Sequence, residues 1–214
     1  SISTTRPYIR ILMSIGSTAI QSEQLDVAIM AYEEIIRLNH NDNTGSRDHL
    51  LACYIKLLGR ILRFPKTKPS RTFEQVERFI KLEWSDDNAF FEEDNLIVRW
   101  FRMLSAYAKK QNWKDIALAE YKKNSTMFQI IFNESDISHT KKEGVKGLDM
   151  ADDVYVKGQM IKEALKDWPS FLMDCYKLIR KGTNDKFIKY VRETAPDIDN
   201  ELSPDYKLSM RTVG

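Results

Sequence analysis

The sequence predicts an all-α fold, and three of its features support this. Apolar residues recur three and four positions apart in successive segments of the 214-residue chain, which is the spacing of one helix face. The eight Gly and six Pro lie mostly between these segments. Two pairs of segments also share one spacing of small and large residues. We therefore expect few or no strands, and one helical body with a continuous core.

The first part of the chain is organised as three pairs of helices. Pro7 stands where a first helical turn tolerates proline, and Pro65 and Pro69 break the pattern between the helices of the second pair. The acidic residues at positions 92–94 suit the N-terminus of the fifth helix. The pairs are expected at residues 6–22 and 25–36, 45–59 and 72–84, and 96–107 and 113–128.

The rest of the chain has helical period as well. Helices are expected at residues 150–168, 169–179 and 186–193. The polar segment 133–147 is the best internal boundary, although its flanks are expected to pack together. The sequence therefore predicts repeated helical hairpins over residues 1–132, a C-terminal helical extension over 133–196 and a loosely held tail over 197–214.

Composition limits the classes of function. The formal net charge is only +2, so the chain as a whole has no long-range attraction for nucleic acid. Cys53 and Cys175 are the only cysteines, which favours a reducing compartment, either cytoplasm or nucleus. No apolar run approaches the ~20 residues that cross a bilayer. The chain begins with Ser1 rather than methionine, as expected for a piece excised from a longer protein.

One spacing of small and large residues occurs twice. Offsets of four, twelve and four residues separate the members of each set, which are Leu12, Gly16, Ala28 and Tyr32 in the first pair and Phe101, Ser105, Ala117 and Tyr121 in the third. Small residues on both helices of a pair let the two backbones approach closely, while large residues fill the spaces between pairs. The repetition predicts an array of similar hairpins.

The first pair resembles the tetratricopeptide repeat. The order large, large, small, large, small, aromatic of that family matches Leu12, Ile15, Gly16, Leu25, Ala28 and Tyr32, with His40 in place of the usual proline. The second helix pair matches more weakly, at Leu51, Ala52, Gly59 and Arg60. The resemblance covers residues 6–128 and implies an antiparallel hairpin array, an α-solenoid. An unrelated helical array is the alternative, and it predicts the same fold class.

The resemblance also implies a concave groove lined by the first helix of each pair. The repeat positions that point into this groove correspond to Arg10, Met13, Ser17, Ile20 and Gln21, to His49, Cys53, Lys56 and Leu57, and to Arg99, Arg102, Ala106, Lys109 and Lys110. Six of these residues are basic and none is acidic, so we expect an acidic segment of a protein partner as the ligand. The alternative is that these cations only solvate exposed helix faces. Met13 and Ser17 replace the Lys and Asn with which some repeats of the family hold chaperone C-termini, so that activity is not expected.

No catalytic, metal, cofactor or small-molecule site is expected. The three histidines lack metal-ligand spacing, and no phosphate loop or nucleophile elbow is present. The four tryptophans are expected in the core rather than on a base-stacking surface. The sequence therefore predicts a non-enzymatic scaffold or adaptor, the alternatives being a nucleic-acid- or ribosome-associated factor that uses the same cations, or an accessory domain of a larger enzyme. The acidic tail is a further candidate to fill the groove.

Overall fold

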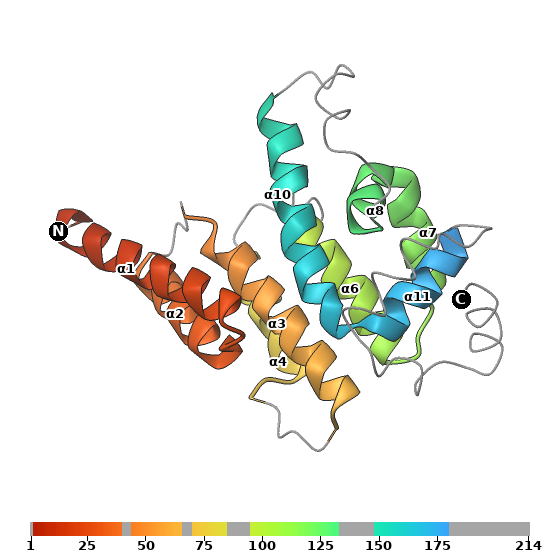
Figure 1. Ribbon diagram of the computed structural model, residues 1–214, viewed down its shortest axis with the longest axis horizontal. Coiled ribbons are helices and arrows are strands. Elements are labelled where there is room, and N and C mark those ends of the chain that lie inside the picture. The colour runs from red at the N-terminus through yellow and green to blue at the C-terminus, as the bar shows by residue number, and fades with distance from the viewer. Residues whose placement is uncertain (1, 40–43, 66–69, 85–94, 133–147, 180–214) are drawn as a thin grey trace. The chain divides into compact units, whose positions relative to one another are not determined.

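The computed structural model describes residues 2–39, 44–65, 70–84, 95–132 and 148–179, and every structural statement below refers to them (Figure 1). They form α-helices and one short 3-10 helix, with no strand among them, which confirms the all-α prediction. The helix expected at 186–193, the tail and the 133–147 segment lie outside these residues. The elements are α1 (Ile2–Gln21), α2 (Leu25–Leu38), α3 (Ser46–Arg63), α4 (Phe73–Glu83), α6 (Leu96–Ala108), α7 (Trp113–Lys123), α8 (Ser125–Ile131), α10 (Leu148–Ala164), η1 (Leu165–Asp167) and α11 (Pro169–Ile179).

The chain forms two compact units, residues 1–101 and 102–214. The division falls inside α6, earlier than the polar segment at 133–147 that the composition favours as a boundary.

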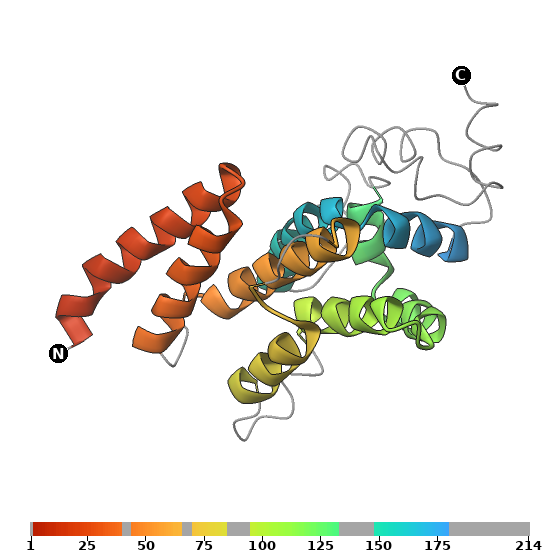
Figure 2. The ribbon, with the colours of Figure 1, turned by 90° about the horizontal axis from the view of Figure 1, so that it is seen from below.

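In the first unit, α1 packs on α2, α2 on α3 and α3 on α4. Figure 2 shows α1 and α2 side by side as a hairpin. A short turn joins them, and the apolar stripe of α2, from Leu25 to Ile36, is buried. On α3 every residue from Leu50 to Gly59 is buried, so this helix is central to the core.

The start of α1 differs from expectation, whereas the start of α4 agrees with it. Helix α1 begins at Ile2, so Pro7 lies inside it and not in its first turn. Proline's fixed φ is helical, and its missing N–H removes one backbone hydrogen bond without preventing the helix. Helix α4 begins where expected, because Thr72 and Gln75 form a capping box: the Thr72 hydroxyl accepts from the Gln75 amide at 3.3 Å, and the Gln75 side chain accepts from the Thr72 amide at 2.8 Å.

In the second unit, α10 packs on α8 and α11 on α7. Rings of Tyr107, Trp113 and Phe171 meet at centroid distances of 5.1 to 5.8 Å. The prediction of one continuous helix over residues 113–128 is wrong, because the helix is interrupted at Asn124. The side chain of Asn124 accepts a hydrogen bond from the Met127 amide and caps the separate helix α8.

The tryptophans lie in or beside the core, as expected. Trp84, Trp100 and Trp168 are buried, and Trp113 is half-buried within the ring cluster. The apolar surface that these rings bury therefore stabilises the core. Among the described helices, none is long and apolar enough to cross a membrane.

Candidate protein-binding surface

On α1, the predicted groove residues share one helix face but differ in accessibility. Arg10, Met13 and Ser17 are spaced by three and four residues. Arg10 and Ser17 are exposed, whereas Met13 is half-buried. The hydroxyl of the buried Ser46, at the start of α3, donates to the Met13 sulfur at 3.4 Å. The N-terminus of α3 therefore lies against the middle of this face.

On α3, His49 contributes to packing. It is half-buried, and its ring stacks on that of Tyr32 with centroids 5.2 Å apart and planes 6° from parallel. Tyr32 itself is fully buried on α2. One face of the His49 ring is therefore occupied by the tyrosine. His49 thus links α2 to α3.

Lys56 is buried and already has a counter-ion. It is 5% exposed, and its Nζ lies 3.2 Å from Oε1 of Glu23 in the turn between α1 and α2. Arg60, one turn further along α3, donates to the other oxygen of the same carboxylate. Partial burial of Glu23 favours a higher pKa, but hydrogen bonds and charge from Lys56 and Arg60 outweigh it, and its pKa is lowered. Lys56 is therefore neutralised within the chain and does not present the accessible cation that the sequence suggested.

Sequence reasoning missed Glu23 because it lies outside both helices. No sequence signal marked it, because the turn after α1 places a non-glycine residue at a left-handed φ of 59°. The Gln24 amide donates to the Ala19 carbonyl at 2.8 Å, and the Glu23 amide to that of Ile20 at 3.1 Å. This pattern is a Schellman motif, and it holds the Glu23 backbone beside α3.

Other cations of the first unit are also paired within the chain. Arg71 donates to Glu33 Oε1 at 2.6 Å, and the Tyr54 hydroxyl donates to the same oxygen at 2.7 Å. Arg47 pairs with Glu83 at 2.9 Å and Arg37 with Glu34 at 2.7 Å. Much of the basic character that the sequence shows in this unit is therefore balanced by neighbouring carboxylates.

The α6–α7 segment differs in its charge balance. Arg99 is half-buried at the end of the first unit, while Arg102, Lys109 and Lys110 are exposed at the start of the second. Residues 95–132 contain seven Lys and Arg but only Asp115 and Glu120 as acids, an excess of five positive charges. Glu120 is buried, so the accessible surface is more basic still. The predicted site residues of the second unit thus lie on a cationic surface.

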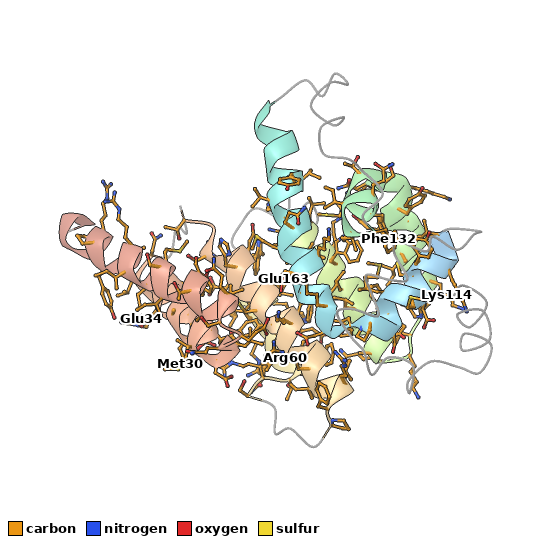
Figure 3. The ribbon with its side chains drawn as sticks, in the orientation of Figure 1. Met30, Glu34, Arg60, Lys114, Phe132 and Glu163 are labelled. Carbon is orange, nitrogen blue, oxygen red and sulfur yellow. The ribbon has the colours of Figure 1, made fainter. Side chains whose placement is uncertain are left out.

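An apolar groove on the α1–α2 hairpin is a feature that the sequence did not predict. It has a volume of about 620 Å³, and its lining includes Leu12, Ile15, Val27, Met30 and Glu34. Met30 and Glu34 are labelled in Figure 3. Met30 is 69% exposed and Ile15 is 41% exposed. Ile15 therefore contributes less to the core than its place in the repeat pattern suggested.

The described residues contain no group of three or more His, Cys, Asp and Glu side chains arranged to hold a metal ion. Both cysteines are buried thiols. Comparisons with protein-family models, with curated proteins and with solved structures found no match.

Proposed function

We propose that the chain is a protein-binding adaptor built from tetratricopeptide-like helix hairpins, and that it binds an acidic segment of another protein. The observation that carries this proposal is the exposed, positively charged surface of α6 and α7. Arg102, Lys109, Lys110 and Lys114 are all exposed there. Arginine forms charge-assisted hydrogen bonds with carboxylates, and lysine steers their approach.

The repeat-like character is supported by two helix ends with the same backbone pattern. Helix α1 is followed by a turn with Glu23 in the left-handed region, and α6 by a turn with Lys110 at a φ of 56°. The Gln111 amide donates to the Ala106 carbonyl at 2.8 Å, as the Gln24 amide does to that of Ala19. The small residues predicted at close crossings, Gly16, Ser105, Ala28 and Ala117, are all buried.

The test compares two double charge reversals. Arg102→Glu/Lys110→Glu alters the proposed surface, and Arg78→Glu/Lys81→Glu alters two exposed cations on α4 as the matched control. Each protein is used for affinity capture from a lysate, and recovered protein and nucleic acid are quantified with and without nuclease. Thermal unfolding establishes that both variants fold.

We expect proteins that carry acidic segments to bind the wild type and the control but not the α6–α7 variant, independently of nuclease. Equal recovery by all three would contradict the proposed surface. Recovery that disappears after nuclease treatment would support nucleic-acid binding instead, and that binding would weaken steeply with salt.

A further inference from the structure

The α1–α2 hairpin carries an exposed apolar face. On α1, Tyr8, Ile11 and Ile15 are spaced by three and four residues and are between 41% and 57% exposed. On α2, Val27 and Met30 are three residues apart and are 41% and 69% exposed. Ile15, Val27 and Met30 line the apolar groove together, so residues from both helices form one patch. Contiguous apolar surface of this kind marks an interaction site, whereas single exposed apolar residues do not.

Helix α3 packs on a different side of the same hairpin. His49 of α3 stacks on Tyr32 of α2, and Ser46 of α3 contacts Met13 of α1. Neither Tyr32 nor Met13 lines the groove. An array of hairpins buries both sides of each hairpin, and a side that stays exposed is normally polar. The apolar face of α1 and α2 therefore has the composition of a covered surface.

The charged residues that line the groove are neutralised within the chain. Arg37 donates to both carboxylate oxygens of Glu34 at 2.7 Å. Glu33 pairs with Arg71 at 2.6 Å. The groove is therefore electrically balanced, and it attracts neither an acidic nor a basic partner strongly. A balanced apolar surface is complementary to another surface of the same kind, and a second copy of the chain carries one.

The face also matches itself in shape. Met30 is the most exposed of its apolar side chains, whereas Leu12 and Ala31 in the groove lining are only 8% and 5% exposed. The face therefore has both a projecting side chain and a hollow with a buried floor. Methionine is flexible and fills apolar hollows of irregular shape. In a contact around a twofold axis, each copy supplies one projection and one hollow.

The size of the face suits a weak dimer. At a rise of about 1.5 Å per residue, the 14 residues of α2 extend about 21 Å and the 20 residues of α1 about 30 Å. Two helices side by side are about 20 Å wide, so each copy contributes about 400–600 Å². The total of about 800–1,200 Å² lies at the lower limit of specific interfaces. Association should therefore be reversible and depend on concentration.

We propose that the apolar face of α1 and α2 is a dimer interface, in which the face of one copy packs on the same face of a second copy. Met30 of each copy enters the groove of the other. Because the same patch is used on both sides, association stops at two copies. The inference is separate from the proposed function, since the α6–α7 surface contributes none of these residues.

Sedimentation equilibrium over a range of protein concentrations tests the association. The average mass of the wild type should rise from 25.0 kDa toward twice that value. Met30→Glu should raise the dissociation constant at least about a hundredfold, because each dimer would bury two carboxylates without counter-ions. Met30→Leu should still dimerise, since it keeps an apolar side chain of similar volume.

The matched control is Leu62→Glu, which places the same charge at an apolar position of α3 that is 47% exposed. It should dimerise as the wild type does, and thermal unfolding establishes that all variants fold. A wild type that stays at 25.0 kDa at every concentration would overturn the proposal. Equal dimerisation of Met30→Glu and the wild type would do so as well, and growth beyond two copies would show a head-to-tail contact instead.

A second measurement locates the contact in the wild type. Peroxide converts accessible methionine to its sulfoxide, and mass spectrometry gives the rate at each residue. Met30 should react more slowly as protein concentration rises, because the dimer covers it. Met13, which is half-buried and contacts Ser46 of α3, is the internal reference and should react at a constant rate. An unchanged Met30 rate at concentrations where the dimer forms would place the contact elsewhere and contradict the proposal.

Discussion

Gly16 of α1 faces the ring of Tyr32 on α2 with no space between them. A Cβ atom at residue 16 would lie 2.7 Å from Cζ and 2.9 Å from Cε2 of that ring. The ring has no easy movement available, because Tyr32 is fully buried and stacks on His49. The small residue is therefore what allows α1 and α2 to approach at this crossing.

The added methyl group of Gly16→Ala should consequently cost about 1–3 kcal/mol, as overpacking of a core usually does. Alanine is favoured over glycine in a helix by about 1 kcal/mol, so the expected net destabilisation is up to about 2 kcal/mol. Chemical denaturation gives the change in unfolding free energy. Gly158→Ala is the control, because its Cβ would meet the side chains of Ile130 and Met127 at 3.1 Å or more, and methionine adapts easily. A Gly16→Ala variant as stable as the wild type would contradict the close crossing.

The Glu23 ion pairs should make stability depend on pH. The pKa of this carboxyl is lowered from 4.5 in the folded chain, because Lys56 and Arg60 outweigh the effect of burial. A lowered acid pKa stabilises the fold above the unfolded pKa, and the contribution is lost as pH falls through the folded value. The difference in unfolding free energy between wild type and Glu23→Gln should therefore shrink below pH 4.5. Because the side chain is 56% exposed, we expect less than about 1 kcal/mol. A difference that does not vary with pH would contradict the pairing.

The helices were predictable because each is encoded locally. The apolar stripe of α2 and the capping box that starts α4 depend on residues within the same segment, and both helices begin where the sequence predicted. The break at Asn124 was not predictable from apolar spacing, since the stripe continues across it. There the Asn124 side chain accepts a hydrogen bond from the Met127 amide, and this bond competes with the continuous helix. The spacing of apolar residues does not indicate such a bond.

The candidate surface was less predictable for a different reason. The spacing of Arg10, His49 and Lys56 fixes the helix face on which each lies, but it does not reveal which side chain from elsewhere covers that face. Lys56 is covered by Glu23, thirty-three residues earlier, and His49 is covered by Tyr32. Such long-range neighbours depend on how hairpins pack, which is information that a single sequence does not supply.

Lys110 should tolerate glycine better than alanine. Its φ of 56° lies in the left-handed region, which costs a residue with a Cβ about 1–2 kcal/mol, whereas glycine adopts it freely. Glycine also loses more conformational entropy on folding, which offsets part of this advantage. The free energy of unfolding of Lys110→Gly should therefore exceed that of Lys110→Ala by up to about 1 kcal/mol. Both variants lose the same charge, so the difference between their stabilities reports the effect of the backbone conformation alone. Thermal unfolding of the pair provides the measurement, and equal stability would exclude a strained turn.

The two thiols should be unreactive in the folded chain. Burial raises the pKa of Cys53 from 9.0 to about 12, although the nearby charge of Lys56 acts in the opposite direction. Burial also raises the pKa of Cys175, which is fully buried on α11. Only the thiolate attacks a disulfide reagent, so a shift of about three pH units lowers the reactive fraction about a thousandfold at pH 8.

Reaction with an aromatic disulfide reagent should therefore be slow in native buffer and rapid in denaturant. Its rate should follow the unfolded fraction as denaturant increases, because access and ionisation both require opening of the core. Single variants Cys53→Ala and Cys175→Ala assign the remaining reaction to one thiol. Fast modification of either thiol under native conditions would show that its helix opens without global unfolding, and Cys53 would then report directly on the α3 surface that includes Lys56.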